Sequence, residues 1–386
     1  MIRKSLVLMT AGLFLTLPTT AWAQSKVFGS AQHAYRVVTV VEGLEIPWSI
    51  AFLPDGDMLV TERPGRLRVV RNGVLLPAVV PGVPDVHAVG QGGLFEVLPH
   101  PEFASNHLLY LSYAHPNADG STTRVVRARL ENDRLTGLEE IFLAASQGNG
   151  HYGGKLAFDL NGYLFITIGE RQVRASGDLE AHPAQDVSNH HGTTIRLHDD
   201  GRVPDDNPFV DQDNARPEIW SYGHRNPQGL AIHPETHDVW ITEHGPQGGD
   251  ELNRIEPGLN YGWPVVGYGV NYRSGLAIHE GTMREGIQHP DHFWVPSIAA
   301  SGLMIYSGAR FPKWRGNMFA GGLAGQQLAR LTLSMDAQEV EQEETLVQGI
   351  GRIRDVREGP DGYIYIATEG RDGALTPIVR LEPTDP

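Results

Sequence analysis

The chain has 386 residues, of which 40% are hydrophobic, which is enough for one large or two ordinary domains with a substantial core. It contains no cysteine, which excludes disulfides, thiolate nucleophiles, thiolate metal sites and covalently attached c-type haem. A formal net charge of −15 argues against nucleic acid as a partner, so an anionic ligand would need a local basic pocket. The 45 glycines and 26 prolines favour an all-β chain of short strands joined by turns.

Residues 1–23 read as a secretory signal peptide. Arg3 and Lys4 precede an apolar run over residues 5–17, and Ala21-Trp22-Ala23 predicts cleavage after Ala23. The run is short for a membrane anchor, and no later segment is apolar enough to span a bilayer. We therefore expect a periplasmic or secreted protein without a membrane span, whose mature chain starts with a polar leader over residues 24–34.

The chain from residue 35 onward repeats one pattern six times. Each unit has an apolar lead-in, a turn rich in Pro, Asp, Asn and Gly, and an alternating strand that ends in Thr, Ser, Glu or Gly; the units begin at Ile46, Gly92, Gly153, Gln228, Ser301 and Ile353. This periodicity predicts a single six-bladed β-propeller of four-stranded antiparallel blades over residues 35–386. Residues 35–41 would close the ring beside residues 377–383. The alternative is a sandwich of unrelated hairpins.

Two long insertions interrupt the repeat, over residues 171–206 and 264–300, and long loops on a rigid ring usually build a site or a partner surface. The acidic run at residues 198–214 lacks the glycine and terminal glutamate of an EF-hand loop, so a solvated turn is the better interpretation. The stretch over residues 221–264 combines a basic pair, a buried-type strand and a Gly/Pro-rich acidic loop. We expect the chemistry there.

Several polar residues could act together at one rim. His151 lies between glycines before a strand and could serve as a base, and Glu170 at a strand end could orient it. Arg225 and Asn226 offer a fork donor beside an amide, suited to a developing oxyanion. Taken singly, each of these residues could instead be a turn histidine, a surface acid or a turn cap.

Two further groups could hold ligands. Arg352 and Arg354 alternate on a strand, so both would face one side and could grip carboxylates. The loop and strand that follow residue 244 offer hard oxygen ligands of the kind that calcium prefers: the carbonyls of Gly245, Pro246 and Tyr261 and the carboxylate of Glu251. A plain loop remains the alternative for this second group.

The strings PWSIAFLPDG, TERPGRL, HYGGKLAF, GHRNPQGLA, EHGPQGGDELN, NYGWP and RIRDV together resemble the glucose/sorbosone dehydrogenase family, and most closely its periplasmic aldose dehydrogenase branch. The resemblance covers essentially the whole mature chain. It implies a six-bladed propeller that binds pyrroloquinoline quinone (PQQ) and calcium, oxidises aldoses at the anomeric C1 to lactones, and passes electrons to an external acceptor.

The resemblance also implies residue roles. His151 matches the base that takes the hydroxyl proton as hydride passes to the quinone, Glu170 the carboxylate that orients it, and Arg225 the residue that stabilises the oxyanion. The positions that match cofactor-holding residues are Gln91, Arg225, Asn226, Tyr272, Arg352 and Arg354. The positions that match calcium ligands are Gly245 and Pro246 for the cofactor calcium, and Glu251 and Tyr261 for a second, structural calcium.

The chain departs from the family pattern at two positions. Ala324 stands where a cofactor-facing lysine is expected, and Glu170 replaces an expected aspartate. Two other functions stay open: a calcium-dependent propeller lactonase or esterase, which would not need paired arginines, and a non-catalytic exported propeller that binds a partner or glycan. Monomer and homodimer are both compatible with the sequence.

Overall fold

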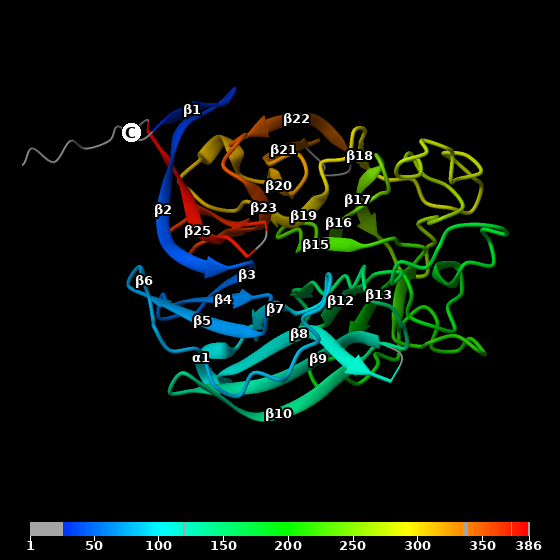
Figure 1. Cartoon of the computed structure of the whole chain (residues 1–386), viewed down its shortest axis with the longest axis horizontal. Helices are drawn as coiled ribbons and strands as arrows, with labels where there is room; N and C mark the ends of the chain where they lie inside the picture. Colours follow the sequence, from blue (N-terminus) through cyan, green and yellow to red (C-terminus); the bar gives the residue numbers. More distant parts are fainter. Residues whose placement is uncertain (1–25, 119, 335–338, 372, 385–386) are drawn as a thin grey trace, which may run out of the picture.

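Six small antiparallel sheets form a ring in the computed structural model, which describes residues 26–118, 120–334, 339–371 and 373–384 (Figure 1). The predicted six-bladed β-propeller is confirmed. The predicted signal peptide lies outside the described residues. Among the described helices, none is both long enough and apolar enough to cross a membrane.

The blades, numbered in chain order, coincide with the six repeated units. Blade 1 contains β3 (Pro47–Phe52), β4 (Met58–Glu62), β5 (Arg66–Arg71) and β6 (Val74–Leu75). Blade 2 contains β7 (Leu94–Pro99), β8 (Leu108–Asn117), β9 (Gly120–Glu131) and β10 (Arg134–Leu143), with α1 (Phe103–Asn106) between its first two strands. Blade 3 contains β11 (Leu156–Phe158), β12 (Leu164–Ile168), β13 (Thr193–Leu197) and β14 (Ile219–Tyr222), with the 3-10 turn Pro183–Gln185 in its long loop.

The second half of the ring follows the same order. Blade 4 contains β15 (Pro227–Ile232), β16 (Val239–Glu243), β17 (Asp250–Ile255) and β18 (His292–Trp294). Blade 5 contains β19 (Ala300–Ile305), β20 (Met318–Gly322), β21 (Gln327–Leu333) and β22 (Val340–Leu346), with the 3-10 turn Pro312–Trp314 after its first strand. Blade 6 contains β23 (Arg352–Glu358), β24 (Ile364–Glu369), β25 (Leu375–Pro383) and the early strand β2 (Ala34–Glu45).

Pairing between the two ends of the chain closes the ring. Strand β2 runs antiparallel to β25, with Tyr35 opposite Pro383 and Val38 opposite Arg380. The predicted closure by residues 35–41 is confirmed, and it removes the free edges that an open ring would leave. The structure adds a short strand, β1 (Val27–Gly29), inside the expected polar leader, where it pairs with β2 as a fifth strand of blade 6.

Apolar residues pack between neighbouring blades, and charged residues lie at the centre. Every residue of β4, β12, β16 and β20 is buried. Near the axis, the ammonium of Lys155 lies 2.9 Å from Glu96 and 2.8 Å from Asp355, and Arg357 contacts both carboxylates. Two cations thus balance two anions and join blades 2, 3 and 6, which fits the rule that buried charges are paired.

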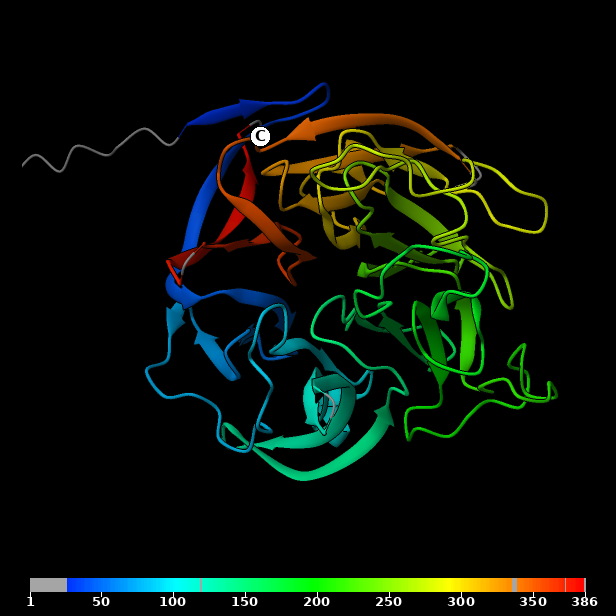
Figure 2. The ribbon, with the colours of Figure 1, turned by 45° about the vertical axis from the view of Figure 1, so that its right-hand side comes forward.

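The two predicted insertions leave the ring as long loops. The first insertion includes most of the loop from β12 to β13, strand β13 itself and the start of the loop from β13 to β14. The second insertion includes most of the loop from β17 to β18. Figures 1 and 2 show these segments, coloured green to yellow, projecting from one side of the ring. They start where the second or third strand of a blade ends, so they can cover side chains delivered by those strands.

Candidate functional site

Four carboxylates mark one end of the ring. Glu62, Glu243 and Glu369 are the last residues of β4, β16 and β24, and Glu170 lies two residues beyond β12. Each of them accepts hydrogen bonds from groups at this end. For example, the backbone N–H of Glu45 donates to Glu62, and the backbone N–H of Arg225 donates to Glu243. We call this end the functional rim, because the polar residues singled out from the sequence converge on it.

His151 and Glu170 form a buried pair at the functional rim. Nδ1 of His151 lies 2.6 Å from Oε2 of Glu170, and the backbone N–H of His151 donates to Oε1 of Gln91 at 2.8 Å. The two side chains are almost fully buried, at 7% and 2% exposure. The residue predicted to be the base and the residue predicted to orient it are thus in direct contact.

Electrostatics hold this pair in a base-competent form. Burial, aided by Arg225 and Arg171, lowers the pKa of His151 below its usual value against the opposing effect of Glu170. Burial alone would raise the pKa of Glu170, but His151 and Arg225 outweigh it and the pKa is lowered. An ionised carboxylate can only accept, so Nδ1 of the neutral imidazole carries the proton and Nε2 keeps a free lone pair.

Arg225 is fixed by the loop after β16. Its backbone N–H donates to Oε2 of Glu243 at 2.6 Å, and its Nη1 donates to the carbonyls of His244 and Gly245 at 2.9 and 2.6 Å. The guanidinium lies over the ring of Trp263 at 5.0 Å, and its buried Nε has no hydrogen-bond partner among the described residues. A rigid cation with an unsatisfied donor is thus available to an oxygen ligand.

A cavity of about 280 Å³ lies at the functional rim. Its lining residues are Trp48, Arg63, Gln91, Phe95, Tyr152, Asn226, Gln228, His244, Ala299, Leu323, Arg352, Arg354 and Glu369. We call it the arginine cavity. Arg354 binds Oε2 of Glu369 through Nε at 2.7 Å, and Arg352 lies 3.4 Å from the other oxygen. The sequence predicted that these two arginines share one face, and the structure adds Glu369 as their common internal counterion.

The amides and one imidazole complete the donor set of the arginine cavity. Asn226 Oδ1 accepts a hydrogen bond from the backbone N–H of Gly153 at 3.2 Å, so the amide NH₂ is the group of this side chain that could donate to a ligand. Nε2 of His244 and Nε of Arg352 are buried without a hydrogen-bond partner among the described residues. Burial, reinforced by Arg354 and Arg225, holds the pKa of His244 well below its usual value, so the imidazole is neutral.

Arg63 is a cation of this cavity that sequence analysis missed. It follows Glu62 at the end of β4, and its pKa is lowered by burial and by Arg354 and Arg352, against the opposing effect of Glu369. A signal for it existed in the sequence. TERPGR repeats the pattern of a strand-end glutamate followed by a turn that also appears as TEHGPQ and ATEGRD.

A second, more open cavity of about 430 Å³ exposes the His151–Glu170 pair; it is lined by Gln91, His151, Glu170, Gln172, Val173, Arg174, Ala175, Arg225, Pro246, Trp263, Asn271, Tyr272 and Ile278. Gln91 lines both cavities, so they adjoin. Tyr272 is 61% exposed at the edge formed by the loop between β17 and β18. The two insertions therefore supply the walls of this cavity.

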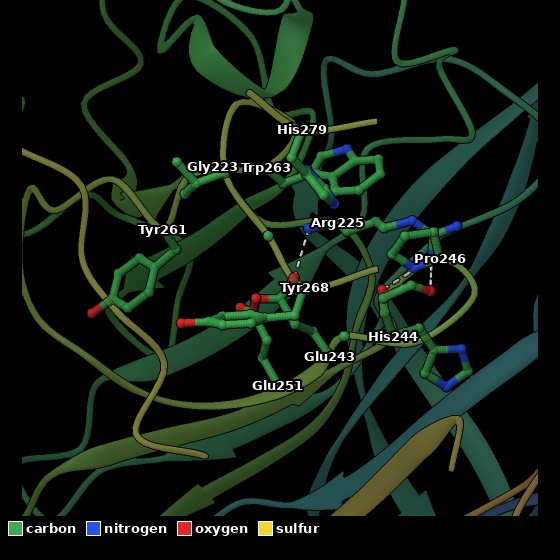
Figure 3. A pocket seen from close by; sticks show the side chains of 14 residues that line it. Gly223, Arg225, Glu243, His244, Pro246, Glu251, Tyr261, Trp263, Tyr268 and His279 are labelled. Carbon is green, nitrogen blue, oxygen red and sulfur yellow. Dashed lines mark hydrogen bonds between the residues drawn. The ribbon is translucent and has the colours of Figure 1, made fainter. Parts of the chain in front are cut away.

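A third, small cavity is rich in oxygen atoms (Figure 3). Glu243 and Glu251 line it together with Gly245, Pro246 and Tyr261. Burial and the neighbouring charges of Glu243 and Asp250 hold the pKa of Glu251 well above its usual value. Two buried carboxylates and several carbonyls favour a hard divalent cation, although the described residues contain no group of three acidic or histidine side chains placed to hold a metal.

The expected calcium ligands differ in how free they are. The Gly245 carbonyl already accepts from Arg225, which leaves one of its two lone pairs. Among the described residues, the carboxylate of Glu251 accepts a hydrogen bond only from Asn253, at 3.2 Å. The Tyr261 hydroxyl donates to Arg254 O at 2.7 Å, so the side chain has a structural partner and only its carbonyl would serve a metal.

Ala324, the position at which a cofactor-facing lysine was expected, is exposed and does not line the arginine cavity. Its backbone N–H donates to the carbonyl of Ile298 at 2.9 Å, within the turn after β20. The cations that line the cavity are therefore Arg63, Arg352 and Arg354.

Comparison with known proteins places the chain in a family. Residues 44–377 match the family model for glucose/sorbosone dehydrogenase. The aldose sugar dehydrogenase YliI of Escherichia coli is 41% identical over 364 residues, covering 92% of this chain and 95% of that protein. A crystal structure of a glucose dehydrogenase superposes with a TM-score of 0.83 at 48% identity, covering 89% of this chain and 98% of that one.

A further solved structure is that of the PQQ-bound form of an aldose sugar dehydrogenase from Streptomyces coelicolor. It superposes with a TM-score of 0.73 at 28% identity, covering 90% of this chain and 98% of that one. The family match spans most of the chain and includes the six blades and the functional rim. The chain therefore belongs to the glucose/sorbosone dehydrogenase family.

Proposed function

We propose that the protein is a quinoprotein oxidoreductase that oxidises aldoses at C1 to lactones. The observation that carries the proposal is the pairing of two adjoining cavities, one with a neutral, carboxylate-oriented histidine and one with three arginines. The names of the relatives, which include a PQQ-bound aldose sugar dehydrogenase, support the same reading. The fold alone would not, because propellers host many activities.

His151 acts as the general base in this proposal. Its Nε2 takes the proton of the C1 hydroxyl while the hydrogen on C1 departs with its electron pair, so that C1 becomes the lactone carbonyl. Glu170 stabilises the imidazolium that results. Arg225 lines the same cavity and stabilises negative charge on the C1 oxygen as the proton leaves.

The arginine cavity fits a cofactor with several carboxylates. Arg352 and Arg354 would supply guanidinium forks, and Gln91 and Asn226 would supply polar contacts. Arg225 and Tyr272 would reach the ligand from the adjoining cavity. The buried, unpartnered Nε atoms of Arg352 and Arg225 are what such a ligand would satisfy. When bound there, pyrroloquinoline quinone supplies the two-electron acceptor for the hydride.

Calcium has two places in the proposal. The carbonyls of Gly245 and Pro246 would hold the cofactor ion, and Glu251 with the Tyr261 carbonyl would hold a structural ion. The support is the oxygen-rich cavity and the raised pKa of Glu251, since a divalent cation would relieve the repulsion between Glu251 and Glu243.

A reconstitution assay tests the function. Metal-free apoprotein receives pyrroloquinoline quinone and Ca²⁺ and is assayed with a panel of aldoses and an artificial electron-acceptor dye. Quinone-dependent dye reduction supports the proposal. Lactone hydrolysis without quinone would favour the lactonase instead, and absence of turnover with any sugar would favour a binding protein. We also propose that the protein is exported and, as a monomer or a homodimer, passes its electrons to an external acceptor.

A further inference from the structure

The arginine cavity carries more positive charge than its own carboxylate can balance. Among the described residues that line it, Arg63, Arg352 and Arg354 face a single acid, Glu369, so the formal charge is +2. The whole chain has a net charge of −15, so this local excess runs against the character of the protein. Crowded guanidiniums repel one another unless an anion joins them.

Arg63 is the arginine of this cavity for which the structure supplies no anchor. Arg352 and Arg354 both contact Glu369, whereas Arg63 forms no side-chain hydrogen bond or ion pair with any described residue. The neighbouring Arg66 and Arg68 both bind Glu62, so unpaired arginine is not a general feature of this turn.

The backbone nevertheless holds Arg63 firmly in place. Its N–H donates to Ile46 O at 3.0 Å, and its carbonyl accepts from Leu94 N at 2.9 Å, which fastens it to blades 1 and 2. Gly93 packs so closely that an added Cβ would lie 2.1 Å from the Arg63 carbonyl oxygen. A fixed backbone carrying an unpartnered, partly buried cation is a preorganised ligand-binding element.

We propose that Arg63 binds a carboxylate of the cofactor and, together with Arg352 and Arg354, makes this cavity selective for ligands with at least two negative charges. The inference rests on the proposed function and assigns a binding residue beyond it. Arg63 comes from blade 1 and the other two from blade 6, so the anion would be held from two walls.

Equilibrium titration of the apoprotein with pyrroloquinoline quinone in the presence of Ca²⁺, followed by intrinsic fluorescence, tests this role. Arg63→Gln should raise the Kd about 10- to 100-fold, the cost of one charge-assisted hydrogen bond, while Arg63→Lys should lose less. Arg202→Gln, which removes the same charge at an exposed turn, should leave the Kd unchanged. If the wild-type protein binds no quinone, the proposed function fails. If the wild type binds quinone and Arg63→Gln binds it equally tightly, the proposed function stands and the role assigned to Arg63 fails.

Two further measurements separate recognition from a structural role. The uncharged trimethyl ester of the quinone should bind wild type and Arg63→Gln with similar affinity, because no carboxylate is left to recognise. The apoprotein of Arg63→Gln should melt at or above the wild-type temperature, because a like charge has been removed from beside Arg352 and Arg354. A marked loss of apoprotein stability, or an equal penalty for acid and ester, would overturn the assignment.

Discussion

Replacing Glu170 by Gln probes the proposed catalytic pair, His151 and Glu170, with little change in shape. In the wild type, Oε2 of the buried carboxylate contacts His151 Nδ1 at 2.6 Å and also accepts from Gln172 N at 3.1 Å. Glutamine keeps the volume but loses the charge, and its amide can either donate or accept. The imidazolium therefore loses its counterion, and the tautomer with a free Nε2 is no longer enforced.

The expected loss follows from the type of bond removed. A hydrogen bond to a charged group contributes about 1.5–3 kcal/mol, and at roughly 1.4 kcal/mol per factor of ten this corresponds to about a 10- to 150-fold fall in kcat/KM. Burial of both partners places the loss in the upper part of that range. The kcat should fall by a similar factor, because the imidazolium forms only as the reaction proceeds.

The pH profile gives a second, independent sign. Glu170 raises the pKa of His151 against the lowering effect of burial and of Arg225 and Arg171. Without the carboxylate this pKa falls further, so the acid limb of kcat/KM should move to lower pH. The activity deficit should consequently be smaller below the wild-type limb than on the neutral plateau.

The assay is steady-state dye reduction by enzyme saturated with quinone and Ca²⁺ across a pH series. Glu170→Asp retains the charge and should lose less activity. Glu218→Gln is a matched control, because Oε1 of Glu218 lies 2.9 Å from Nε2 of the buried His190 in a similar carboxylate–histidine contact. Neither residue lines the cavities described above. Unchanged kcat/KM in Glu170→Gln, or an acid limb that moves to higher pH, would refute the role assigned to the pair.

Three other outcomes are expected. His151→Ala should bind quinone with unchanged Kd but lose about two to four orders of magnitude in turnover; retained turnover would remove His151 from its role. Lys155→Met should lower the free energy of unfolding by about 3–5 kcal/mol, measured by urea denaturation, because Glu96 and Asp355 keep their buried charges without it; a neutral result would contradict this account of the core. Ca²⁺ should raise the melting temperature of the wild type more than that of Glu251→Gln, and equal shifts would argue against the structural calcium site.

The blade architecture was readable from the sequence because its signals are local. Each blade repeats the same turn residues and the same alternating strand. The early strand β2 is rich in apolar residues like β25, the strand with which it pairs. The same local logic predicted that Arg352 and Arg354 share a face, and both do reach Glu369. Family motifs pointed to His151 and Glu170, which the structure places in contact.

Other features depend on ring closure, which brings together residues that no sequence period relates. Lys155, Glu96 and Asp355 come from three blades, and each alone would be taken for a surface charge; only the closed ring joins them, together with Arg357, into one cluster of two cations and two anions. Arg63 looks like another exposed turn residue until blades 1 and 6 meet and set it beside Glu369. Local periodicity determines which strands form, whereas the charge of a cavity is a sum over distant segments that only tertiary packing can assemble.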